Sequence, residues 1–123
     1  MSDSSGQSPR PVGPYTPIVR AGGWLICSGQ VGLADGKLVD GGVAAEVTQA
    51  VANLDALLRS EGASVANVMK TSVFLADIGE YGAMNEAYIA AFNDHRPARS
   101  AFAVAGLPLG ARVEIEAWAW IGQ

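Results

Sequence analysis

The chain has 123 residues, half of them hydrophobic, and a formal net charge of −4. This length and composition allow one buried core, which excludes an intrinsically disordered protein. The acidic balance supplies no cluster of basic side chains to neutralise phosphates, so a nucleic-acid partner is not expected.

The N-terminal segment, residues 1–14, is rich in Ser, Pro and Gly. It is predicted to be a flexible lead-in that ends in a turn at Gly13-Pro14. Residues 15–123 contain no linker-like break and predict a single domain. No apolar run typical of a secretory signal or a membrane span is present, and a lone cysteine, Cys27, fits a reducing compartment. A cytoplasmic location is therefore expected.

Two short apolar runs open the domain, at residues 18–21 and 24–28. Gly22-Gly23 between them predicts a β-hairpin. Residues 35–42 contain Asp-Gly and Gly-Gly pairs and are expected to form a loop.

Residues 44–61 are predicted to form a helix, because apolar residues recur at the spacing of one helical face. Gly62 stands where a helix C-cap belongs. A strand over residues 68–77 and a second helix over residues 80–93 follow. The residues that share one face are Val47, Val51, Leu54 and Leu58 in the first helix, Met69, Thr71, Val73 and Leu75 in the strand, and Tyr81, Met84, Tyr88 and Phe92 in the second helix. The other face of the strand, with Lys70, Ser72, Phe74 and Ala76, is also largely apolar, so both of its faces are expected to be covered.

Two final strands are predicted at residues 100–105 and 112–121, which gives the order β-β-α-β-α-β-β. Crossover connections place both helices on one face of a mixed sheet, so the fold class is α+β. In the last strand, two tryptophans and two glutamates alternate with small apolar residues. Neither face resembles a solvated surface, so one is expected under the helices and the other against a second copy of the chain.

Few residues suit metal or nucleophilic chemistry. The single histidine, His95, precedes a proline turn and is expected to be a solvated loop residue. Cys27 lies within a strand and is expected to be a small core residue. No metal-ligand spacing and no phosphate-binding glycine loop is present, so neither a metal nor an organic cofactor is expected.

Arg99 and the glutamates of the last strand are the remaining candidates. Arg99 opens an apolar strand and needs a partner, which is either the carboxylate of a ligand or a structural salt bridge to a glutamate of the last strand. Glu114 and Glu116 share a face with the tryptophans. Such a glutamate either has a raised pKa and serves as a base, or forms a salt bridge at the rim.

These residues lie within segments that resemble the RidA/YjgF family of reactive intermediate deaminases. The segments are VGPYT (12–16), CSGQ (27–30), VMKTSVFLAD (68–77), MN (84–85) with Tyr88, RPARS (96–100), LP (107–108) and VEIEA (113–117). They arrive in the family's order and cover nearly the whole chain from Pro11 onward.

The resemblance implies a chorismate-mutase-like α+β sandwich in a homotrimer, with active sites in the clefts between subunits. It implies hydrolysis of short 2-imino acids (2-iminobutanoate and 2-iminopropanoate) to 2-oxo acids and ammonia, without a cofactor. Arg99 matches the arginine that binds the substrate carboxylate, and Glu114 matches the glutamate that positions the attacking water. Tyr15, Ser28, Gly29 and Asn85 match residues that line the pocket. Ala101 stands where many members have a cysteine, and the loop near His95 is shorter than in many members.

Two other functions remain open. The same cleft in a non-catalytic module would hold a small carboxylate and regulate a partner. Ribonuclease activity or inhibition of translation, attributed to some members of the family, is disfavoured by the acidic composition.

Overall fold

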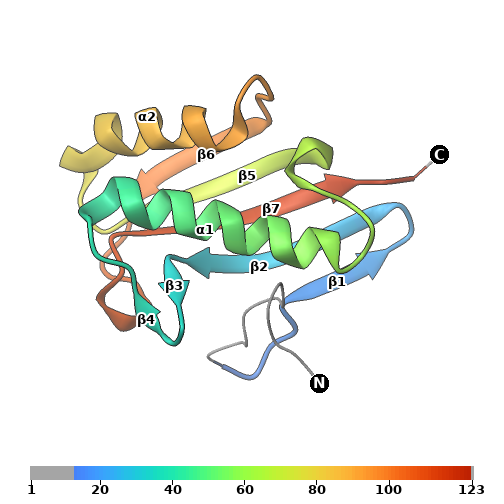
Figure 1. Cartoon of the computed structure of the whole chain (residues 1–123), viewed down its shortest axis with the longest axis horizontal. Helices are drawn as coiled ribbons and strands as arrows, with labels where there is room; N and C mark the ends of the chain where they lie inside the picture. The colour runs from blue at the N-terminus through green and yellow to red at the C-terminus, as the bar shows by residue number, and fades with distance from the viewer. Residues whose placement is uncertain (1–12, 123) are drawn as a thin grey trace.

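The computed structural model describes residues 13–122. A five-stranded sheet in the order β1-β2-β7-β5-β6 carries two helices, and the α+β class predicted from the sequence is confirmed (Figure 1). Its elements are β1 (Ile18–Ala21), β2 (Trp24–Val31), α1 (Gly42–Arg59), β5 (Val68–Leu75), α2 (Tyr81–Phe92), β6 (Ala98–Ala103) and β7 (Val113–Trp120). Of the lead-in predicted for residues 1–14, residues 1–12 lie outside the described part of the chain. At its end, the Tyr15 N–H donates to the Gly13 carbonyl across 2.9 Å, as expected for a turn.

A small two-stranded ribbon occupies the region where a loop was expected. Its strands, β3 (Leu33–Ala34) and β4 (Lys37–Leu38), pair in antiparallel fashion. Asp35 and Gly36 at the turn have φ angles of 55° and 81°. Positive φ at both central residues is the requirement of the tight hairpin turn that Asp-Gly favours. Apart from these two short strands, the strands and helices follow the predicted order.

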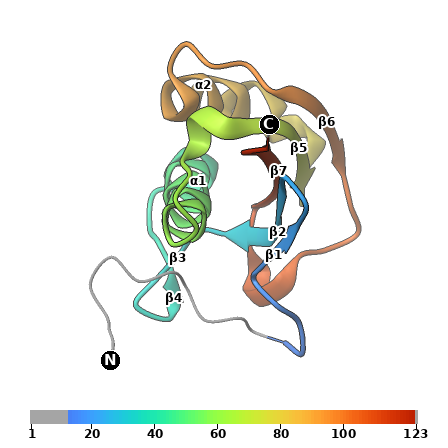
Figure 2. The same cartoon turned by 90° about the vertical axis from the view of Figure 1, so that its right-hand side faces the viewer.

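Both helices cover the same face of the sheet because of how the strands are connected. Strand β7 runs antiparallel to β2 and to β5, so β2 and β5 run in the same direction, and β5 pairs with β6 in parallel. The connections β2-α1-β5 and β5-α2-β6 are therefore two crossovers that advance in the same direction across the sheet. Right-handed crossovers of this kind place their helices on one side, as Figure 2 shows.

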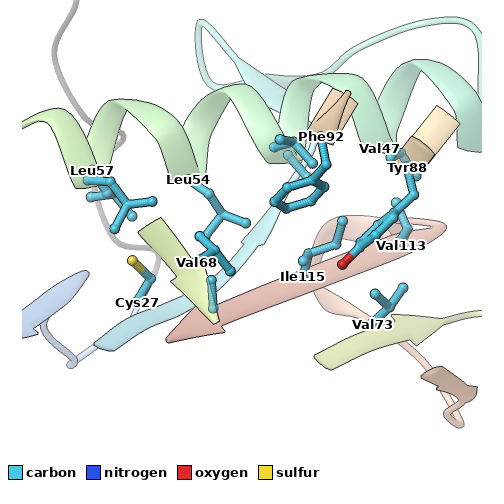
Figure 3. Packing of buried hydrophobic residues seen from close by; sticks show 14 of the residues in the cluster. Cys27, Val47, Leu54, Leu57, Val68, Val73, Tyr88, Phe92, Val113 and Ile115 are labelled. Carbon is cyan, nitrogen blue, oxygen red and sulfur yellow. The ribbon is translucent and has the colours of Figure 1, made fainter. Parts of the chain in front are cut away.

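The hydrophobic core lies between the helices and the sheet (Figure 3). Val47, Leu54 and Leu58, which the helical spacing assigned to the inner face of α1, are fully buried. Burial of each such side chain contributes about 1.5–3 kcal/mol. Alternate residues of β7 complete the floor of the core: Val113, Ile115, Ala117 and Ala119, all fully buried. The alternation in the last strand separated its two faces as predicted, and the small apolar face is the one that lies under the helices.

One residue of β5 leaves the face to which the alternation assigned it. Thr71, Val73 and Leu75 are buried as predicted, but Met69 is 52% exposed. The register between β5 and β7 shifts between Val68 and Lys70. An extra residue in one strand interrupts the alternation of faces, and here it turns Met69 outward.

Figure 2 shows that α1 and α2 both lie on one face of the sheet and that neither covers the other face. That other face carries aromatic side chains of β2 and β7. Trp24 packs edge-to-face against Trp118 and Trp120, with ring centroids 5.9 and 5.0 Å apart. Trp118 and Trp120 remain 42% and 39% exposed in the single chain. Coverage of this face by a second copy stays a prediction. Among the described residues, no helix is both long and apolar enough to cross a membrane.

Candidate active site

A β-bulge in β2 shapes the first part of the site. The register with β7 shifts between Cys27 and Gln30, so that Ser28 and Gly29 together lie opposite Glu116. A bulge of this kind bends the strand and redirects its side chains. The Ser28 hydroxyl then donates to the Thr16 carbonyl across 2.7 Å, which holds the bulge against the segment before β1.

The bulge forms the wall of a cleft of about 310 Å³. Its lining combines hydroxyl groups, carboxylates and exposed backbone, contributed by Tyr15, Ser28, Gly29, Pro108, Glu114 and Glu116. Five residues that the resemblance or the strand pattern singled out therefore meet in one place: Tyr15, Ser28, Gly29, Glu114 and Glu116. Pro108 was not predicted. It follows Leu107 in a loop, and no local pattern indicates which side of the sheet that loop reaches.

Gly29 is a glycine because the Glu114 carboxylate lies against it. A Cβ atom at Gly29 would lie 1.9 Å from Oε2 of Glu114. No real Cβ approaches an oxygen so closely, so any side chain here would displace the carboxylate. The bulge and the glutamate are thus matched in shape.

Glu114 and Glu116 project from the face opposite to the buried Val113 and Ile115. Burial raises the pKa of Glu114 above its usual value, and the negative charge of Glu116 raises that pKa further. This direction agrees with the first of the two alternatives that the sequence left open. Within residues 13–122 neither glutamate forms an ion pair, so a salt bridge at the rim is not made inside the single chain.

Arg99 lies on the other side of the sheet, against α2. Its Nη2 donates to the Tyr81 hydroxyl across 3.0 Å, and Nη1 lies 3.8 Å from the sulfur of Met84. The guanidinium carbon sits 4.9 Å from the centre of the Tyr88 ring and 5.6 Å from that of Tyr81. These separations are typical of cation–π contacts.

The salt bridge proposed between Arg99 and a glutamate of the last strand is not present. Three other arginines of the described region pair with carboxylates, which are the pairs Arg20–Glu61, Arg59–Asp55 and Arg112–Glu80. Arg99 has no such partner within residues 13–122. Its neighbours are neutral, so its positive charge is held in place without being neutralised.

Two further polar groups of α2 lie near Arg99, the hydroxyl of Tyr88 and the side-chain amide of Asn85. The Thr71 hydroxyl, which is fully buried, forms a 2.7 Å hydrogen bond with the Tyr88 hydroxyl. Asn85 lies four residues after Tyr81 and three before Tyr88, so it shares their side of α2. The side-chain oxygen of Asn85 is buried and accepts no hydrogen bond within the described chain. The tyrosines were predicted only as an apolar helix face, and nothing in their spacing indicates a cation beside them.

Ala101 follows Arg99 two positions along β6, opposite Val73. Like Arg99, it faces the helix layer, where it packs against the core. The single chain therefore divides the predicted site into two parts. Arg99, Ala101 and Asn85 lie at the β6–α2 edge, whereas Glu114 and the bulge lie on the open face.

His95 is not the solvated loop residue that was expected. It is partly buried, and its Nε2 forms a hydrogen bond with the Val68 carbonyl at the start of β5. This contact ties the end of α2 to the sheet. Cys27 is buried as predicted, and burial raises the pKa of its thiol to about 12, so it is not a nucleophile near neutral pH.

Comparison with known proteins places the chain in a family. The family model described as Endoribonuclease L-PSP matches residues 5–121. A Mus musculus protein named 2-iminobutanoate/2-iminopropanoate deaminase is 46% identical over 116 residues, which are 93% of this chain and 86% of that protein. A Schizosaccharomyces pombe protein named mmf1, mitochondrial, is 38% identical over 85% of this chain and 66% of its own length.

The fold agrees as well. The crystal structure of RidA from an Antarctic Psychrobacter species is 33% identical, with a TM-score of 0.89 over 96% of this chain and 97% of that one. The YjgF gene product of E. coli is 34% identical, with a TM-score of 0.84 over 94% of each chain. The chain therefore belongs to the endoribonuclease L-PSP family, which is the RidA/YjgF family. The resemblance found in its sequence is confirmed.

Proposed function

We propose that this protein hydrolyses short 2-imino acids, such as 2-iminobutanoate and 2-iminopropanoate, to 2-oxo acids and ammonia. The observation that carries the proposal is the state of Arg99, a partly buried cation held by neutral groups with no carboxylate partner in the described chain. A guanidinium fork in this state suits the carboxylate of a small acid. The name of the mouse relative supports the choice of imine.

The working unit is a homotrimer with its active sites between subunits. The aromatic face of the sheet supports this assembly, because large exposed apolar patches mark contact surfaces. Only 16% of the residues are charged, against about 25% in ordinary globular domains. In a trimer, Arg99 of one subunit faces the Glu114 cleft of the next, which joins the two parts that one chain keeps on opposite sides of its sheet.

In the proposed reaction, Arg99 fixes the substrate carboxylate and Glu114 directs one water molecule at the imine carbon. Glu114 accepts a proton from that water as the new C–O bond forms, and the imine nitrogen takes up a proton. The C–N bond of the resulting amino alcohol then breaks: Glu114 returns its proton to the nitrogen, the hydroxyl oxygen gives up its own proton and forms the carbonyl, and ammonia leaves. A positioned base contributes about 10²–10⁴-fold, and fixed orientation supplies further acceleration.

The other matched residues shape the pocket. Tyr15, Ser28 and Gly29 line the side of the cleft from which water approaches. The unpartnered side-chain oxygen of Asn85 is an acceptor for the N–H of the imine. Ala101 carries no thiol, so its contribution is restricted to its backbone. The reaction requires neither a metal nor an organic cofactor, because an imine conjugated to a carboxylate is already electrophilic.

We place the protein in the cytoplasm as one domain over residues 15–123, with no nucleic-acid partner and a role in removing damaging metabolites. The net charge of −4 supports the exclusion of nucleic acid. The fission-yeast relative is named mitochondrial, so fractionation of the native host is the direct check on location.

The decisive test replaces Arg99 with Ala. An amino-acid oxidase generates the imine, and semicarbazide reports how fast it disappears. We expect kcat/KM to fall about 100-fold or more, because a buried charge pair with the substrate is lost, while native mass still shows a trimer. No acceleration by the wild type, together with binding of 2-oxobutanoate, would instead establish a binding module.

A further inference from the structure

The Arg99 guanidinium is enclosed by three residues of α2, and these differ in what they offer. Met84 and Tyr88 are buried, with 0% and 4% of their surfaces exposed, whereas Tyr81 is 40% exposed. Tyr88 already uses its hydroxyl in the bond with Thr71. Tyr81 is therefore the residue of this group that reaches both the guanidinium and the surface from which a ligand arrives.

The backbone fixes the place of Tyr81. It is the first residue of α2 and directly follows a short 3₁₀ helix, Ile78–Glu80. The Asp77 carboxylate caps that turn by accepting the Gly79 N–H across 2.8 Å. The Glu80 carboxylate in turn pairs with Arg112 across 3.0 Å. These two contacts fix the backbone directly before Tyr81, and with it the point from which the tyrosine side chain projects.

We propose that Tyr81 is a positioning residue for substrate binding, whose hydroxyl holds the Arg99 guanidinium in the orientation that receives the carboxylate. This inference rests on the proposed function. A free arginine side chain loses about 2 kcal/mol of rotamer entropy when it is fixed. The hydroxyl oxygen accepts one N–H of Nη2 and fixes the plane of the fork before the substrate arrives, which leaves the remaining N–H groups for the carboxylate.

The hydroxyl and the ring of Tyr81 make separable contributions. The ring lies 5.6 Å from the guanidinium carbon and stays in place if only the hydroxyl is removed. Loss of one such hydrogen bond corresponds to about three- to ten-fold in affinity. We expect Tyr81→Phe to raise KM for the imine, and Kd for 2-oxobutanoate, by this factor. Because water attack occurs elsewhere, kcat stays within about two-fold. Tyr81→Leu, which also loses the ring, has the larger effect.

A double-mutant cycle with Arg99→Lys tests whether Tyr81 acts through Arg99. The lysine retains the charge but has no planar fork to hold, so the added effect of Tyr81→Phe shrinks to less than about two-fold. Thr48→Ala is the matched control, since it removes the hydroxyl bond to the Ala44 carbonyl on the exposed side of α1 and leaves KM unchanged.

Calorimetric binding of 2-oxobutanoate separates this inference from the proposed function. If the wild type binds the acid and Tyr81→Phe binds it equally well, the positioning role is overturned while the deaminase proposal stands. Effects of Tyr81→Phe and Arg99→Lys that simply add, or a fall in kcat without a rise in KM, overturn it too. If the wild type neither binds the acid nor hydrolyses the imine, both proposals fall together.

Discussion

The two parts of the candidate site solve opposite electrostatic problems. At the β6–α2 edge, the cation Arg99 is surrounded by aromatic rings, a hydroxyl and a sulfur. In the cleft on the other face, two carboxylates lie close together, and burial and mutual repulsion raise the pKa of Glu114. Each part holds charge that its own surroundings do not neutralise.

Most proteins remove such charges by pairing them within the chain, as the other three ion pairs do here. Keeping Arg99 and Glu114 unpaired on opposite faces prevents them from quenching each other. A ligand with one anionic end and one electrophilic end would use both. The separation therefore supports the proposal that a neighbouring copy completes the site, without a rearrangement within one chain.

The largest expected effect comes from mixing two inactive variants. If Arg99 and Glu114 act from different subunits, mixed trimers of Arg99→Ala and Glu114→Gln regain some intact sites. Random assembly from equal amounts restores about one quarter of the sites. Imine hydrolysis after co-refolding measures this recovery.

Each variant refolded alone is the control for this experiment and should stay inactive. Native mass must also show that the mixed trimers have formed. Activity that remains at the level of the single variants, in verified mixed trimers, would place Arg99 and Glu114 in the same subunit's site and break the comparison drawn above.

A smaller but still large loss of rate is expected from Gly29→Ala, which tests the contribution of the Glu114 cleft. The new methyl group occupies the position of the Glu114 carboxylate, and displacing a base by about 1 Å costs about 10²-fold in rate. Arg99 lies beyond the reach of this change, so Kd for 2-oxobutanoate moves much less than kcat.

Gly82→Ala is the matched control for Gly29→Ala. A Cβ atom there meets nothing within 4 Å, and alanine within a helix is more stable than glycine by about 0.5–1 kcal/mol. Its activity should be unchanged and its Tm raised. Equal loss of activity in the two variants would show that Gly29 has no special relation to Glu114.

The smallest effect is a pH shift in Glu116→Gln. Glu114 must be ionised to accept a proton, so kcat/KM falls as the pH falls through its raised pKa. Removing the negative charge of Glu116 lowers the pKa of Glu114, and the acid limb of the pH profile then moves to lower pH. Because burial is the larger cause and remains, the limb stays above that of an ordinary carboxyl group. An unmoved limb would mean that another group controls it.

The sequence predicted the parts of this molecule that depend on periodic patterns. Helical spacing identified the buried face of α1, and alternation separated the two faces of β7. The pattern failed where a single residue broke it: the extra residue at Met69 reversed a face, and the bulge at Ser28 and Gly29 was invisible because no composition marks it.

The partners of Arg99 were beyond prediction for a different reason. Its neighbours come from α2, up to 18 positions earlier in the chain, and the pairing depends on how a helix lies over a parallel crossover. Local reasoning offered a glutamate or a ligand, since those are common partners of arginine. Tyrosines at helical spacing indicate a buried face, and only the fold shows that this face meets a cation.

The position of β7 has a consequence for how the protein is made. Strand β7 lies at the middle of the sheet, yet it is synthesised after the sheet's four other strands. Leu25 of β2 therefore has no partner on that side until Ala119 is made. Until β7 leaves the ribosome, β2 and β5 both expose an unpaired edge. Such edges are prone to pair with other chains. The nascent chain is thus most vulnerable to aggregation in the interval before β7 emerges, and Glu114 reaches its place only when that period ends.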